Sequence, residues 1–221
     1  QINVIGTLRL LEASRRSGID KFIFASAGST LYGDPEINPC TEEHSIIPVS
    51  PFGMSKYQGE LQLELYRRLY LLRCTALRYG NVYGPRQDPY GESGVVAIFS
   101  QAMLEGRQPQ IFGDGEQSRD FIFVEDVVDA NLNAIGRGDG MSFNISTGQG
   151  TNINSIFRLL QGIIGYRWPA DHGPARAGDV YQIYLENSKA AEVLGWTPQA
   201  SLEEGLLRTV EYFSQTAKAA R

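Results

Sequence analysis

The chain has 221 residues, of which 42% are hydrophobic and 20% charged, and its formal net charge is -5 at pH 7. This composition is typical of a globular protein with a sizeable core, and the length predicts one large domain or one domain with a smaller lobe. Lysines and arginines are scattered rather than clustered, so we expect no nucleic-acid partner. The sequence contains neither an apolar run of about 18 residues nor a signal-peptide pattern, and we expect a cytoplasmic protein with no membrane span.

Cysteine and histidine usage argues against two further classes of protein. Cys40 and Cys74 lie far apart, and neither a CxxC motif nor a histidine-rich stretch accompanies them. A disulfide framework and a metal site are therefore not expected. With only His44 and His172, the chain also offers no convincing Ser-His-Asp triad.

The first third of the chain predicts a helix, a strand, a loop, a second helix and a second strand. The first helix covers about residues 3–17, begins at the very start of the sequence, as in a fragment of a longer protein, and ends at Gly18. The apolar run KFIFAS predicts a buried strand, and a loop rich in Gly, Pro and Ser follows it. The second helix begins near Pro51 and is expected to carry three leucines toward a core, namely Leu61, Leu65 and Leu69. The stretch RCTALRYGNVYGP predicts the second strand and its exit.

The remainder predicts shorter elements. A helix is expected near residues 95–105, short strands at QPQIF and RDFIFV, and a helix at about residues 125–136. The stretch FNISTGQGTNINSIFRLLQGIIG predicts a strand, a turn and a helix that begins at Asn152 or Asn154. Two short helices end the chain, and Ser201 and Glu204 form a capping box for the second.

Alternation of strands and helices predicts an α/β fold with a parallel, doubly wound sheet. In such sheets the ligand lies outside the carboxyl ends of the strands. This rule places residues 26–33, residues 81–88 and the helix start at Phe52 at one site.

The motif PFGMSK holds a pair of side chains with a specific chemical meaning. Lys56 follows Phe52 by four residues, so both side chains project from one face of the helix, one turn apart. A tyrosine at position 52 would gain from this lysine, because the ammonium group favours the phenolate and lowers the phenol pKa. Phenylalanine has the ring without the titrating group. Taken alone, the motif also fits a plain helix start with an exposed lysine.

Loop residues supply further side chains that could bind a ligand. Ser26, Ser29 and Thr30 offer hydroxyls to a sugar, although turn residues of a solvated loop would look the same. Three loop arginines could each pair with a diphosphate or be ordinary surface residues, namely Arg86, Arg119 and Arg176. Asp179 could accept bonds from ribose hydroxyls, and Phe112 could stack on a base or belong to the core. No GxGxxG or GxxGxxG motif follows any predicted strand.

Seven segments in order resemble the extended short-chain dehydrogenase/reductase family. Within it, the chain resembles the NAD-dependent sugar-nucleotide epimerases, most closely the UDP-glucose 4-epimerases. The segments are NVIGTLRLLEA, KFIFASAGSTLYGD, SPFGMSK, LRYGNVYGPRQDPYGESGVVAIF, IFGDGEQSRDFIFVEDVVDA, FNISTGQG and ARAGD. They span nearly the whole chain, so the match is specific and outweighs the plainer interpretations of the isolated motifs.

The resemblance implies a partial Rossmann-like sheet with a smaller α/β substrate-binding lobe. Residues 1–80, with about residues 118–136 returning to them, would form part of the NAD-binding domain, and residues 81–221 mainly the sugar-nucleotide lobe. It also implies a homodimer, in which the helices near residues 3–17 and 51–71 form a four-helix bundle.

The implied reaction is the interconversion of UDP-glucose and UDP-galactose through a 4-keto intermediate. NAD takes the hydride from C4 of the hexose, the tyrosine of a YxxxK motif removes the hydroxyl proton, and a Ser or Thr relays it. Lys56 matches the lysine of this motif. The resemblance assigns the cofactor to Ser26, Phe52, Lys56, Tyr79 and Val82. It assigns the UDP-hexose to Asn81, Val95, Gln110, Phe112, Arg119, Arg176 and Asp179.

Three departures from the family pattern bear on catalysis. Phe52 occupies the tyrosine position, and the relay hydroxyl aligns with Ala27 or, in another alignment, with Gly28, which leaves Ser29 or Ser26 as the nearby substitute. The family's N-terminal βαβ units, with the GxxGxxG loop that holds NAD, have no counterpart in the sequence. We therefore expect a family member that is inactive or strongly impaired as written, by engineering or by drift. The alternative is a catalytically silent sugar-nucleotide-binding or structural protein of the same fold.

Overall fold

The computed structural model describes residues 1–90, 94–176 and 179–219, with side chains described up to residue 216. Within the motif ARAGD, Ala177 and Gly178 lie outside the described residues. No helix in the described part of the chain is both long and apolar enough to cross a membrane.

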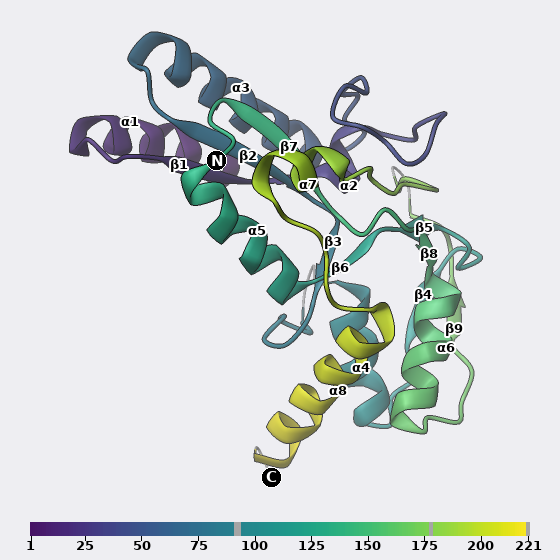
Figure 1. The fold of residues 1–221 in the computed structure, drawn as a ribbon. Helices are drawn as coiled ribbons and strands as arrows, with labels where there is room; N and C mark the ends of the chain where they lie inside the picture. The colour runs from purple at the N-terminus through teal and green to yellow at the C-terminus, as the bar shows by residue number, and fades with distance from the viewer. Residues whose placement is uncertain (91–93, 177–178, 220–221) are drawn as a thin grey trace.

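A three-stranded parallel sheet forms the first part of the molecule (Figure 1). Its strands are β1 (Phe22–Ala27), β2 (Cys74–Tyr79) and β7 (Met141–Ile145), in the order β1-β2-β7. Arg78 bonds to α3 (Pro51–Tyr70), whereas the next residue, Tyr79, bonds to α5 (Val124–Gly136). Because successive residues of a strand point to opposite faces, α3 and α5 cover opposite faces of the sheet. The predicted doubly wound α/β fold is confirmed.

Three helices and three strand pairs form the second part of the molecule, on the lower right of Figure 1. The helices are α4 (Val95–Leu104), α6 (Ile153–Ile164) and α8 (Leu202–Ala219). The parallel pairs are β3 (Asn81–Tyr83) with β6 (Phe121–Phe123) and β4 (Gln110–Phe112) with β9 (Asp171–Gly173), and the antiparallel pair is β5 (Ser118–Arg119) with β8 (Thr151–Asn152). Buried side chains of these elements form one core cluster, which includes Phe99, Ile111, Phe121, Phe157 and Leu206.

Four further helical segments complete the described part of the chain. They are η1 (Ile2–Gly6), a π-helical turn, followed by α1 (Thr7–Ser17), α2 (Gly28–Leu31) and α7 (Ser188–Leu194). Gly18 ends α1 in the left-handed conformation with φ of 63°. Asn152, rather than Asn154, caps α6, and its Oδ1 accepts from the Ser155 N–H. Helix α8 has 18 residues and is therefore longer than predicted.

The expectation for the second helix was wrong in one respect. Ser50 caps α3, Pro51 begins it, and the Gly53 N–H donates to Ser50 Oγ, as expected of a helix start. The three leucines predicted to enter a core are instead half or more exposed, at 52% for Leu61, 50% for Leu65 and 61% for Leu69. Leu63 and Tyr66 fill the core in their place. The spacing of four identified one face of the helix, but sequence alone did not tell which of its two apolar faces meets the sheet.

The segment η1–α1 likewise has one buried and one exposed apolar face. Leu11 of α1 is fully buried between α3 and the sheet, whereas Ile5 of η1 and Leu8 of α1 are 46% and 43% exposed. The boundary expected at residue 80 stays a prediction. Strand β7 lies after that boundary in the sequence but pairs with β2, so it belongs to the same sheet as β1 and β2.

Candidate functional site

Lys56 lies at the carboxyl end of β1, on the first turns of α3. Its Nζ donates to the Ala25 carbonyl oxygen at 2.8 Å and lies 5.7 Å from the centre of the Phe52 ring. Partial burial lowers the pKa of Lys56. Phe52 itself is 50% exposed. The predicted juxtaposition of positions 52 and 56 is therefore present, with a half-exposed ring where a phenol would meet the ammonium group.

The end of β1 and the short helix α2 provide few free hydroxyls. Ser26 is buried, and its Oγ donates to Glu60 Oε1 at 2.6 Å, so this hydroxyl faces α3. Thr30 Oγ1 donates to the Ala27 carbonyl oxygen at 3.2 Å. Ser29 is partly buried in α2. Ala27, at the end of β1, has no hydroxyl to offer.

Gly28 is too tightly packed to carry a relay side chain without rearrangement. A Cβ at this position would lie 2.5 Å from Leu185 Cδ1 and 3.1 Å from the Arg78 carbonyl oxygen. Of the two alignments for the relay hydroxyl, the packing favours the one that assigns it to Ala27.

Tyr79 and Val82 flank this region on the neighbouring strands. Tyr79 is the register partner of Ala27, and its hydroxyl exchanges hydrogen bonds with the Asn131 side chain of α5. Burial raises the pKa of Tyr79. Val82 is partly buried in β3, and its carbonyl oxygen accepts from Gln87 Nε2.

The seven residues predicted to bind a sugar nucleotide all line one cavity. Its volume is about 380 Å³, and it lies among β3, α4, β4, β5 and the start of α6. The predicted residues are Asn81, Val95, Gln110, Phe112, Arg119, Arg176 and Asp179. Sequence reasoning missed further lining residues, such as Ile98, Gln117 and Phe121, because they carry no distinctive chemistry and only the fold brings them to the cavity.

Polar groups in the cavity suit an anionic ligand with ring hydroxyls. Arg119 donates to Asp179 Oδ1 at 3.1 Å, and burial lowers the pKa of Arg119 while Asp179 opposes that shift. The Arg176 guanidinium lies 3.8 Å from the centre of the Phe112 ring. Asn81 Oδ1 is buried and has no hydrogen-bond partner among the described residues. A buried acceptor of this kind is costly unless a ligand or water completes it.

Arg86, the third loop arginine, lies outside this cavity. It is exposed and lines a separate hollow with Tyr90 and Tyr212. Its backbone is left-handed, with φ of 71°.

A match to a family model places the chain among known proteins. Residues 1–146 match the model of the NAD dependent epimerase/dehydratase family. The chain belongs to this family. It is 46% identical over 213 residues to UDP-glucose 4-epimerase of Mycolicibacterium smegmatis, a match that covers 96% of this chain and 68% of that relative.

Two solved structures of epimerases have the same fold. The UDP-glucose 4-epimerase of Thermotoga maritima, solved with UDP-glucose, is 52% identical with a TM-score of 0.96, over 97% of this chain and 70% of that chain. A UDP-glucuronic acid 4-epimerase of Bacillus cereus is 32% identical with a TM-score of 0.90, over 97% of this chain and 68% of that chain. The latter is a tyrosine-to-phenylalanine mutant in complex with NAD and UDP-4-deoxy-4-fluoro-glucuronic acid.

The residues around Lys56 fit the NAD that this family uses. Its ammonium group has three N–H donors, and Ala25 is the single hydrogen-bond acceptor that it contacts among the described residues. Two donors therefore remain for a ligand. That Lys56, Tyr79 and Val82 would hold the nicotinamide end stays a prediction.

Proposed function

We propose that this epimerase-family chain keeps the UDP-hexose site but lacks the acid-base groups for rapid interconversion of UDP-glucose and UDP-galactose. The cavity carries the first half of this proposal, because it gathers all seven residues that were predicted to bind the sugar nucleotide. Phe52 and Ala27 carry the second half, since neither side chain can take or relay a proton. The Bacillus cereus mutant, which holds NAD and a UDP sugar despite a tyrosine-to-phenylalanine change, supports the separation of binding from chemistry.

Each group of the site has a definite task in this proposal. NAD, when bound, supplies the hydride acceptor and donor for C4 of the hexose. Arg119 and Arg176 bind the diphosphate, Asp179 orients the ribose, and Asn81 Oδ1 accepts a hydrogen bond from the ligand. Lys56 orients the nicotinamide ribose. A proton of the C4 hydroxyl would find no acceptor at position 52, because phenylalanine has no titrating group.

Binding of UDP-glucose should depend on Arg176. We expect Arg176→Ala to weaken UDP-glucose binding by about 10- to 100-fold, because a hydrogen bond between charged groups contributes roughly 1.5–3 kcal/mol. Isothermal titration calorimetry of the full chain measures this effect. Arg158→Ala is the matched control, because Arg158 is an exposed arginine on α6 and does not line the cavity. Absence of UDP-glucose binding by the unaltered chain at millimolar concentration would contradict the proposal.

We also propose that the chain forms a homodimer through α1 and α3. The exposed stripe of Leu61, Leu65 and Leu69 lies on α3, and the exposed side chains of Ile5 and Leu8 lie on η1 and α1, which pack against it. Apolar side chains that follow two adjacent helices are typical of a subunit interface. The same surface also fits the alternative function, a catalytically silent assembly protein.

A single charge in the stripe should separate the subunits. We expect Leu65→Glu to convert the dimer into a monomer, because the interface would bury an unpaired carboxylate. Sedimentation-velocity ultracentrifugation gives the mass. Leu132→Glu is the control, since Leu132 is similarly exposed at 59% but lies on α5, on the opposite face of the sheet. Equal masses for the unaltered chain and Leu65→Glu would contradict a dimer through this surface.

A further inference from the structure

A row of buried polar side chains crosses the sheet one residue before its strands end. Ser26, Arg78 and Asn144 are register partners on β1, β2 and β7. They are 3%, 5% and 0% exposed. Because side chains alternate between faces, all three point to the face that α3 covers. Such a row requires a partner from α3 to satisfy its charge.

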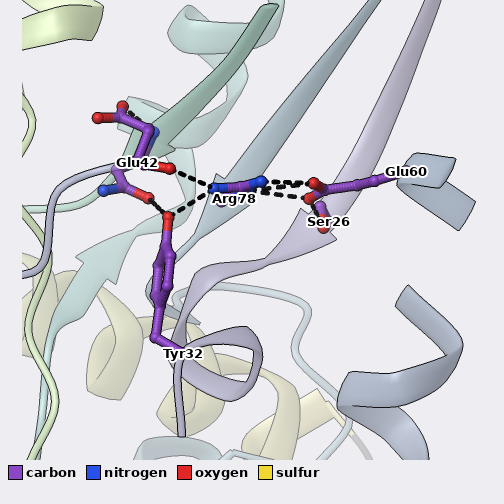
Figure 2. A network of polar contacts seen from close by, with 6 residues as sticks. Ser26, Tyr32, Glu42, Glu60 and Arg78 are labelled. Atoms are coloured by element: carbon purple, nitrogen blue, oxygen red, sulfur yellow. Dashed lines mark hydrogen bonds and ion pairs between the residues drawn. The ribbon is translucent and has the colours of Figure 1, made fainter. Parts of the chain in front are cut away.

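Glu60 of α3 is that partner (Figure 2). Its Oε2 lies 2.7 Å from Arg78 Nη2, and its Oε1 accepts from Arg78 Nε at 3.0 Å. Ser26 Oγ donates to the same carboxylate at 2.6 Å. The Glu60 and Arg78 side chains are only 8% and 6% exposed. Two parallel bonds between a carboxylate and a guanidinium fix both distance and orientation.

The Arg78 Nη1 group, which points away from Glu60, is held by further hydrogen bonds. Its Nη1 donates to Tyr32 Oη at 2.8 Å and to the Glu42 carbonyl oxygen at 3.3 Å. Tyr32 Oη in turn donates to Asn144 Oδ1 at 2.9 Å. Arg78 is therefore held by Glu60 of α3 at one end and by two loop segments at the other, and it offers α3 a rigid attachment point.

Glu60 follows Lys56 by four residues, so the two side chains leave the same face of α3 one turn apart. Lys56 Nζ bonds to the Ala25 carbonyl oxygen, and Glu60 bonds to Ser26, the next residue of β1. One turn of α3 is thus tied at both ends to consecutive residues of the strand. We propose that Glu60 is a positioning residue, whose bonds to Ser26 and Arg78 fix the height and rotation of α3 and so hold the Lys56 ammonium group at the carboxyl end of β1.

The strength of the ion pair does not explain its presence. A buried ion pair can often be replaced by apolar residues of similar volume with little loss of stability. What apolar residues cannot replace is the directional, bidentate attachment one turn from Lys56. The inference rests on the proposed function only in that Lys56 serves the nicotinamide ribose. Its test needs neither NAD nor turnover.

The test follows the Lys56 side chain directly. The chain has four lysines, so a carbon–proton correlation spectrum of protein labelled in lysine resolves them, and Lys56→Arg assigns the signal. In Glu60→Gln we expect the Lys56 signal to shift and its titration midpoint to rise toward that of a free lysine, because the released side chain becomes hydrated. Loss of a negative charge alone would lower the midpoint, so a rise reports movement and not charge.

Two further variants serve as a control and as a replacement for Glu60→Gln. Glu64→Gln is the matched control: Glu64 lies one turn further along α3 but pairs with the partly buried Arg67 and the exposed Arg68, and the Lys56 signal should not move. Glu60→Leu combined with Arg78→Met removes both charges and keeps the packing, so it decides the matter even where Glu60→Gln does not fold. An unshifted Lys56 signal with an unchanged midpoint in this folded double variant would overturn the inference. UDP-glucose calorimetry on the same proteins tests the proposed function independently.

Discussion

Replacing Phe52 by tyrosine and Ala27 by threonine in one chain should raise the rate of UDP-galactose conversion to UDP-glucose by roughly 10²- to 10⁴-fold. The reason is local. Position 52 already lies one helical turn from Lys56, whose ammonium group is 5.7 Å from the ring centre. A phenol at the same place would meet that charge, which lowers the pKa of the phenol and favours the form that accepts a proton. Conversion is followed by proton NMR of the sugar in the presence of NAD.

Three related chains show whether the gain comes from the intended groups. Phe52→Tyr alone should recover part of the gain, and Ala27→Thr alone should recover little, because a relay without a base has no proton to pass on. Adding Lys56→Met to the double variant should remove most of the gain. A double variant that binds UDP-glucose and NAD by calorimetry but stays as slow as the unaltered chain would contradict the assignment of these two positions.

Part of the site could be predicted because it lies just beyond the end of a strand. Asn81 follows β2 by two residues, at the carboxyl end of a parallel strand, where such sheets bind their ligands. Phe112, Arg119, Arg176 and Asp179 were placed by resemblance to the family, and the structure gathers them at the same cavity as Asn81. Whether each residue binds the ligand stays a prediction.

The fate of the leucines on α3 could not be predicted. Leu61, Leu65 and Leu69 repeat every four residues, which is the pattern of a buried face, yet Leu63 and Tyr66 contact the core instead. A helix that packs on a sheet and, as proposed, on a second subunit needs two apolar faces, and the sequence does not say which face meets the sheet.

The attachment of Glu60 to Arg78 was equally hidden. Nothing in the sequence distinguishes Glu60 from the exposed Glu64 one turn later. An arginine inside the apolar strand CTALRY was the available signal, because a buried charge requires a partner. Only the strand register shows that Ser26 and Asn144 flank it.

The buried carboxylate of Asp120 should be important for stability, and we expect Asp120→Asn to lower the free energy of unfolding by about 2–4 kcal/mol. Its side chain is buried and accepts four hydrogen bonds. Oδ1 accepts from the N–H and the hydroxyl of Thr147, at 2.8 and 2.7 Å. Oδ2 accepts from the N–H groups of Gly148 and Leu185, at 3.0 and 3.2 Å. An asparagine must turn an NH₂ group toward one of these donor pairs, and the facing backbone N–H groups then lose their acceptor.

Urea denaturation followed by circular dichroism measures this loss as a lower midpoint. Asp114→Asn is the control, because the Asp114 carboxylate is exposed and accepts one bond, from the Glu116 N–H at 2.9 Å, so its loss should cost well under 1 kcal/mol. Equal midpoints for the two variants would contradict the role of Asp120. Its backbone carbonyl oxygen also accepts from the Asn81 N–H at 2.6 Å, next to the cavity. The same residue therefore ties the loops after β2 and β7 together at the edge where the sugar nucleotide is proposed to bind, and Asp120→Asn should weaken UDP-glucose binding along with the fold.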